Sequence, residues 1–140
     1  MDAGTRWATA AVFMWIGMVL AISFVEAPLK FRAPGVTLRI GLGIGRLVFR
    51  ALNVFEYVFA VVISVALFTH ETPTSLNVAL CVAVGALLTQ TIAVRPLLSR
   101  RTTAVLEGDE SRRSKAHVTY VALEVVKVAA LVCTGVVLVD

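Results

Sequence analysis

Charged side chains are scarce in this sequence. They make up 16% of the residues, whereas about 25% is usual in soluble domains. Hydrophobic residues make up 59%, and the mean hydropathy is +0.89. A chain of 140 residues cannot bury so much apolar surface in a soluble core. The composition therefore excludes a soluble globular protein and predicts one all-α domain, residues 1–140, that spans a membrane several times.

Cysteine and histidine are also rare, with two of each. Cys81 and Cys133 lie in apolar segments and form no CxxC motif, so we expect them to be buried as small hydrophobic residues. His70 lies in a polar turn, where we expect it to be solvated, and His117 opens the last apolar segment. No HxxxH or ExxH spacing is present. No cofactor is predicted, and a metal site made of carboxylates and a histidine is left open.

The long apolar runs predict four membrane spans that form a four-helix bundle. We place them at residues 7–25, 54–68, 76–94 and 117–139. No small-x-small cleavage site follows the first run, so we expect a retained span rather than a signal peptide. Pro28 is expected to interrupt or end the first helix. If the helix continues past it, Glu26 and Lys30 have the spacing of an ion pair.

A basic amphipathic helix is predicted over residues 36–53, directly before the second span. Arg39, Arg46 and Arg50 share one of its faces, which is typical of contact with anionic lipid headgroups. This helix either lies in the membrane plane or extends the second span. Gly41 and Gly45 form a small-xxx-small pair, which favours close packing against a neighbour.

Lysine and arginine are concentrated in two of the three connections between spans. The first connection holds five, the third holds six and the second holds none. They are Lys30, Arg32, Arg39, Arg46 and Arg50, and then Arg95, Arg100, Arg101, Arg112, Arg113 and Lys115. The positive-inside rule therefore predicts a multi-pass protein of the plasma (inner) membrane with both termini outside. The same distribution accounts for the net charge of +4 without nucleic acid.

Polar side chains form a stripe on the last span. Tyr120, Glu124 and Lys127 all lie within about 80° of His117 around the helix axis. Lipid offers no hydrogen-bond partners, so this stripe must face protein or water. The predicted topology places further polar residues at a similar depth, in the cytoplasmic half of the bundle. The complete predicted layer is Glu26, Asn53, Glu56, Gln90, His117, Tyr120, Glu124 and Lys127.

Three interpretations of this layer are open. It is a hydrogen-bond network that fixes helix packing in a non-catalytic interaction or assembly subunit. Alternatively, it lines a cytoplasm-facing cavity that handles a proton, a cation or a small solute, with Glu56 and Glu124 as the principal acids, His117 as a relay and Lys127 as a counter-ion. A cofactor-binding redox protein is the third reading.

Catalysis and partners are less well indicated. There is no nucleophile elbow and no Ser-His-Asp pattern, which disfavours an enzyme, and Ser23 and Ser64 are expected to bond back to their own helices. The expected partners are the lipid bilayer and its anionic headgroups, together with either further copies of the chain or a membrane complex.

Three sequence features resemble a known family. The first span closes in Phe24-Val25-Glu26-Ala27-Pro28-Leu29-Lys30-Phe31, a glycine-rich helix with Leu47-Val48-Phe49-Arg50 follows, and a histidine opens the last span. In these features the chain resembles small four-span membrane proteins of unknown function, of the transmembrane protein 205-like, domain of unknown function 4149 type. The resemblance implies a four-helix membrane fold, and the family supplies no established chemistry.

Overall fold

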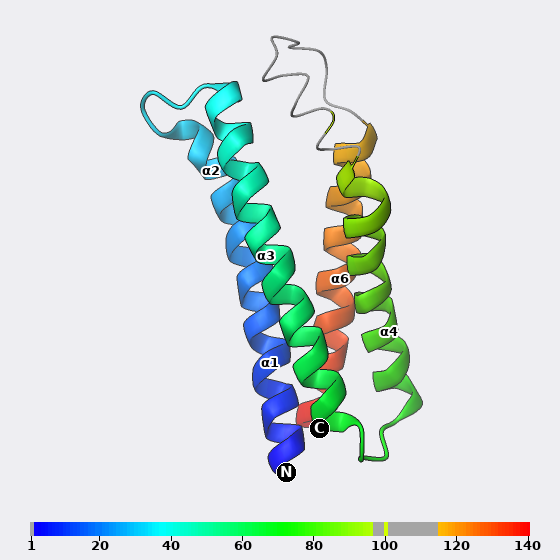
Figure 1. Cartoon of the computed structure of the whole chain (residues 1–140). Coiled ribbons are helices and arrows are strands. Elements are labelled where there is room, and N and C mark those ends of the chain that lie inside the picture. The colour runs from blue at the N-terminus through cyan, green and yellow to red at the C-terminus, as the bar shows by residue number, and fades with distance from the viewer. Residues whose placement is uncertain (1, 97–99, 101–114) are drawn as a thin grey trace.

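Four long apolar helices form an antiparallel bundle in the computed structural model (Figure 1). The structure describes residues 2–96, 100 and 115–140; in the last helix it describes the side chains from residue 118 onward. The helices are α1 (Ala3–Val19), α3 (Leu38–Leu67), α4 (Thr74–Thr89) and α6 (Lys115–Val139). Each, with its helical continuation, is long and apolar enough to cross a membrane. The predicted all-α, four-span architecture is confirmed.

The first span begins earlier and ends later than residues 7–25. Asp2 caps α1 by accepting a hydrogen bond from the Thr5 backbone N–H at 2.8 Å. After Val19 the chain continues as a π-helical segment, η1 (Leu20–Glu26), then α2 (Ala27–Leu29) and a 3₁₀ turn, η2 (Lys30–Arg32). The helical path thus continues past Pro28. A proline ring crowds the carbonyl four residues earlier, and the wider π turn directly before Pro28 relieves that crowding.

Because the helix continues past Pro28, Lys30 comes back over Glu26 and over α3. Its Nζ lies 3.8 Å from Glu26 Oε2, so the ion pair that was expected if the helix continues past Pro28 is formed. On α3, Gly41 and Gly45 are both buried. A Cβ at Gly41 would lie 2.1 Å from the Phe31 ring, and one at Gly45 would lie 2.9 Å from Lys30 Nζ. The small-residue face of α3 therefore receives the turn that follows the first span.

The second span is one continuous helix of 30 residues, and it includes the basic segment. Thr37 caps its start by accepting from the Ile40 N–H at 3.2 Å. At 1.5 Å per residue such a helix is about 45 Å long, longer than the ~30 Å hydrocarbon core. The basic segment therefore extends the second span instead of lying in the membrane plane.

The third and fourth spans also exceed their predicted limits slightly. Helix α4 starts at Thr74, directly after Pro73, and continues as a second π-helical segment, η3 (Gln90–Val94). Helix α6 begins at Lys115, two residues before the predicted start at 117, and ends at Val139. Both π-helical segments lie toward the same end of the bundle as the connection between η2 and α3 (Figure 1).

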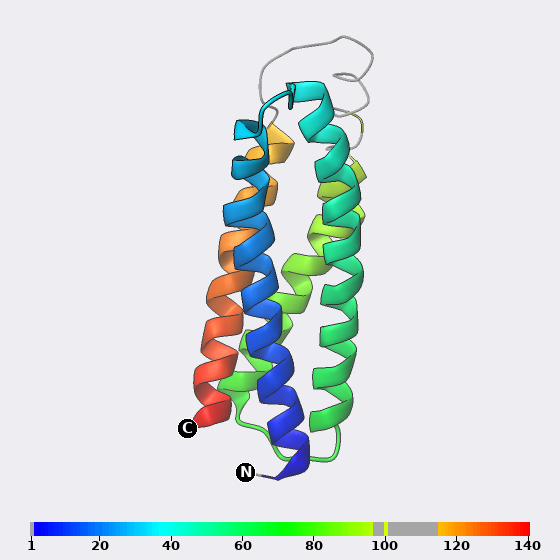
Figure 2. The ribbon, with the colours of Figure 1, turned by 90° about the vertical axis from the view of Figure 1, so that its left-hand side faces the viewer.

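The helices pack as two layers of two. Helices α1 and α3 form one layer, and α6 and α4 form the other, with α1 packed beside α6 (Figures 1 and 2). Packing is extensive between α4 and α6, between α1 and α3, and between α1 and α6. Helices α3 and α4 contact one another little. The bundle is therefore closed along three of its edges and loosely joined along the fourth.

Most of the bundle core is apolar, and so is its outer surface. Trp15, Ile63, Leu87 and Leu131 are fully buried. Many valines, leucines and phenylalanines of all four spans are exposed, as expected for a surface that faces lipid. Cys81 and Cys133 also lie on this outer surface as free thiols. The expectation that they are buried is wrong, because an apolar residue in a membrane helix can face lipid as well as protein.

Candidate functional site

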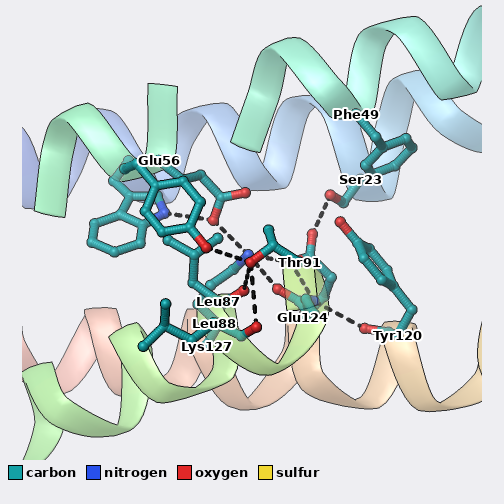
Figure 3. Close-up of polar contacts among 12 residues, drawn as sticks. Ser23, Phe49, Glu56, Leu87, Leu88, Thr91, Tyr120, Glu124 and Lys127 are labelled. Atoms are coloured by element: carbon teal, nitrogen blue, oxygen red, sulfur yellow. Dashed lines mark hydrogen bonds and ion pairs between the residues drawn. The ribbon is translucent and has the colours of Figure 1, made fainter. Parts of the chain in front are cut away.

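A buried group of three ionisable side chains lies at the centre of the bundle. Lys127 Nζ lies 2.5 Å from Glu56 Oε2 and 2.5 Å from Glu124 Oε1. Lys127 and Glu56 are fully buried, and Glu124 is 2% exposed. Glu56 comes from α3, whereas Glu124 and Lys127 are three residues apart on α6. One ammonium group thus joins two carboxylates across the bundle (Figure 3).

Gln90 holds this group together from the third span. Its side-chain oxygen accepts from Lys127 Nζ at 2.8 Å, and its Nε2 donates to Glu124 Oε1 at 2.9 Å and to the Tyr120 carbonyl at 3.2 Å. Trp15 of α1 donates its indole N–H to Glu56 Oε2 at 2.9 Å. Every span therefore contributes a side chain to what we call the charge cluster: Trp15, Ser23, Glu56, Gln90, Glu124 and Lys127.

Ser23 joins the charge cluster at the second oxygen of Glu124. Its hydroxyl donates to Glu124 Oε2, so the expectation that Ser23 bonds back to its own helix is wrong. Ser64 does bond back, to the Ala60 carbonyl at 2.8 Å. The difference arises because Ser23 lies on the face of the first span that meets α6, where a carboxylate competes for its proton.

Tyr120 lies beside the charge cluster. It is 7% exposed, its ring packs edge-on against Phe49 with centroids 5.8 Å apart, and its hydroxyl points toward the Ser23–Glu124 contact (Figure 3). The hydroxyl stands near the Asn53 amide, yet it has no hydrogen-bond partner among the described residues. A buried polar group without a partner is uncommon in folded proteins and calls for a physical explanation.

Polar contacts join α3 to the end of the third span, where the two helices otherwise meet little. Arg95 donates to the carbonyls of Phe49 at 3.2 Å and Arg46 at 3.3 Å. With its amide turned to satisfy both neighbours, Asn53 accepts from Arg95 and donates to Glu56 Oε1 at 3.3 Å. In the sequence, Arg95 counts among the basic residues of the connection between the third and fourth spans. In the structure its guanidinium group reaches back to α3 and, through Asn53, to the charge cluster.

Both π-helical segments carry members of this site. Ser23 lies in η1 and Gln90 begins η3; Thr91, the next residue of η3, shares a hydrogen bond with Tyr57 of α3. A π turn inserts one more residue than an α turn and so redirects the side chains that follow it, and such segments occur frequently at functional sites. Here they direct polar side chains inward from two spans that are otherwise apolar.

Two predicted members of the polar layer are not placed in the charge cluster. Glu26 is half-buried beside Lys30. For His117, near the start of α6, the side chain lies outside the described part of the chain, so its place in the layer stays a prediction. The other six predicted residues lie in or next to the charge cluster: Asn53, Glu56, Gln90, Tyr120, Glu124 and Lys127.

The remaining predicted residues lie toward the ends of the bundle. On the basic segment, Arg39 and Arg50 are exposed and Arg46 is half-buried. His70 was expected to be solvated, but it is half-buried and its Nε2 lies 2.7 Å from Asp2 Oδ2. That contact ties the turn after α3 to the start of α1.

Three important residues were not predicted: Trp15, Ser23 and Arg95. Trp15 carried a usable signal, because a tryptophan in the middle of a membrane span has an N–H that needs an acceptor. Ser23 and Arg95 carried none, since a serine in a span and an arginine after one each have a common alternative role.

The chemistry that this site can support is proton or cation exchange. Two carboxylates and one ammonium leave a net charge of −1 when all three are ionised. Among the described residues there is no group of three His, Cys, Asp or Glu side chains that would hold a metal ion. No protein-family model, curated protein or solved structure matches this chain.

Proposed function

We propose that this four-span membrane protein binds and releases a proton at the charge cluster, and that it thereby handles protons or small cations at the membrane. The observation that carries the proposal is the imbalance of charge in a fully buried site: Glu56 and Glu124 share the single ammonium of Lys127. An unbalanced charge is costly in a membrane interior. Arg95 reaches Glu56 only through Asn53. Within the buried group of Glu56, Glu124 and Lys127, one further positive charge would therefore give neutrality.

The contacts support a role for each residue. In this proposal Glu56 and Glu124 are the acids, Lys127 is their internal counter-ion, and Gln90 holds Glu124 and Lys127 in register. His117 and Tyr120 lie on the same helix toward its start, and we assign His117 as a relay to the aqueous side. By the positive-inside rule that side is the cytoplasm, in a protein of the plasma (inner) membrane with both termini outside.

The exposed arginines of the basic segment support a second element of the proposal. Arg39 and Arg50 are exposed on the part of α3 that extends toward the predicted cytoplasmic face. Their charges are suited to the phosphates of anionic lipids, which would hold α3 at a fixed depth. We also propose kinship with the transmembrane protein 205-like proteins, on the features quoted above.

Trp15 provides a direct test, because its indole N–H bonds to Glu56. The chain has two tryptophans, and Trp7 is 68% exposed, so a Trp7→Phe protein in lipid nanodiscs reports on Trp15 alone. We expect its emission to titrate with pH in a single step, and Glu124→Gln to abolish that step. Proteoliposomes of the same protein should acidify in response to an imposed potential. A flat titration with intact helical content would refute the proposal.

A packing role is the second candidate, and one specific observation favours it. The three hydrogen-bond donors of Lys127 Nζ have three acceptors, Glu56, Glu124 and Gln90, drawn from three spans. Such a network would fix helix register in an assembly subunit. The two candidates differ in the outcome for Glu124→Gln: proton flux is lost if the site handles protons, and only stability changes if it serves packing.

A further inference from the structure

The hydrogen-bonding capacity of the charge cluster is used unevenly. On the Glu56 side it is well used, since Oε2 accepts from Trp15 and Lys127 and Oε1 accepts from Asn53. Gln90 donates two bonds and accepts one. A carboxylate can accept about four hydrogen bonds, and Glu56 accepts three.

Glu124 also accepts three bonds: its Oε1 receives Lys127 and Gln90, and its Oε2 receives the Ser23 hydroxyl. The Glu124 side differs in the hydroxyl oxygens that stand beside it. The Ser23 oxygen keeps its acceptor lone pairs. The hydroxyl of Tyr120, a residue only 7% exposed, points toward this contact and has no hydrogen-bond partner among the described residues (Figure 3). Oxygen atoms of three side chains with unused lone pairs therefore converge at one place.

We propose that Glu124 Oε2, the Ser23 hydroxyl and the Tyr120 hydroxyl bind one monovalent cation, either a hydronium ion or Na⁺. This inference rests on the proposed function and specifies where the balancing positive charge is held. All three ligand atoms are oxygens, the ligand type that hard cations prefer. A single positive charge brings the net charge of Glu56, Glu124 and Lys127 from −1 to zero, so a divalent ion would overshoot.

The chain supplies matched controls for both hydroxyls. Tyr57 and Tyr120 are the two tyrosines of the sequence, and Tyr57 bonds to Thr91, between α3 and η3. Ser64 bonds back to its own helix, whereas Ser23 binds Glu124. Tyr57→Phe and Ser64→Ala therefore remove the same chemical groups as Tyr120→Phe and Ser23→Ala, without touching the proposed cation site.

The experiment measures cation binding in nanodiscs of zwitterionic lipid, with Trp15 emission as the readout in the Trp7→Phe background. One arm titrates pH in choline buffer without Na⁺, and the other titrates NaCl against choline chloride at fixed pH and ionic strength. Binding of radioactive Na⁺ to the same sample gives the stoichiometry. A pH response without a Na⁺ response assigns hydronium, and a saturable Na⁺ response with one ion bound per chain assigns Na⁺.

We expect Tyr120→Phe and Ser23→Ala each to weaken binding of the responding cation by about tenfold, the usual effect of one hydrogen bond to a charged group. Tyr57→Phe and Ser64→Ala should leave it within about twofold. If Glu124→Gln abolishes the response while both hydroxyl variants match wild type, this inference is wrong and the proposed function stands. If wild type responds to neither cation, both are wrong. Circular dichroism verifies folding throughout.

Discussion

Replacing Lys127 with methionine tests the physical basis of the site most directly. Methionine keeps much of the length of the side chain but removes the charge, and it leaves Glu56 and Glu124 buried without their counter-ion. Each pair is 2.5 Å long, so the Coulomb attraction at an effective dielectric of ~20 is about 7 kcal/mol per pair. Desolvation offsets most of this, and removing one partner of a buried pair usually costs about 3–5 kcal/mol.

The assay is equilibrium unfolding of the detergent-solubilised protein, followed by helical circular dichroism, for wild type and Lys127→Met at pH 8 and pH 5. We expect a loss of about 3–5 kcal/mol at pH 8. The loss should shrink at pH 5, because a protonated carboxyl needs no counter-ion. Adding Glu56→Gln and Glu124→Gln to Lys127→Met should recover most of the stability at pH 8.

Two outcomes would contradict this prediction. If Lys127→Met unfolds within about 1 kcal/mol of wild type at both pH values, the ammonium does not neutralise the two carboxylates as the contacts indicate. An unchanged deficit in the triple variant would mean that lost packing, and not unpaired charge, causes the destabilisation.

Three further outcomes are expected. Tyr120→Phe should unfold at an equal or higher denaturant concentration than wild type without Na⁺, since it removes a buried hydroxyl that has no hydrogen-bond partner among the described residues. Gly4→Ala should lose about 1–3 kcal/mol in the same assay, because its Cβ would lie 2.6 Å from an α3 carbonyl, whereas Gly17→Ala, with open space, should gain up to about 1 kcal/mol. The Thr5 backbone hydrogen bond lowers the pKa of Asp2 below 3.8, so its stabilisation is present above that pH and lost as pH falls through the lower, folded-state pKa. Acid titrations should show a shallower loss for Asp2→Asn.

The sequence predicts the architecture well, because the main requirement of a membrane span is local. A run of about 20 apolar residues must cross the hydrocarbon whatever surrounds it. The polar stripe on the last span could be predicted for the same reason, because Glu124 and Lys127 cannot face lipid. Their contact with Glu56 could be anticipated because the predicted topology places Glu56 at a similar depth in the membrane.

Partner choice inside the bundle was harder to predict. Ser23 bonds across to Glu124, and Ser64 bonds back to its own helix, although both are serines in apolar spans. The difference depends on rotation of the helices about their axes, which a π-helical segment changes. No residue within 20–26 or 90–94 marks these segments as π-helical, and the proline two residues after each, Pro28 or Pro96, predicts only an interruption or an end of the helix. The contacts of Arg95 could not be predicted either, because counting the basic residues of a connection does not show which groups a long side chain reaches.

The two π-helical segments also change how the protein responds to the number of residues in a span. A one-residue deletion from the regular α-helical part of a span would leave its hydropathy almost unchanged, but it would turn everything after the deletion by about 100° relative to everything before it. The same deletion within residues 20–26, with that segment restored to α-helix, would nearly preserve the orientation, because a π turn holds one residue more than an α turn. Whether a homologue one residue shorter keeps Lys30 on the glycine face of α3 therefore depends on where in the first span the residue is missing. Alignments of such proteins should therefore be read by gap position within the spans as well as by residue identity.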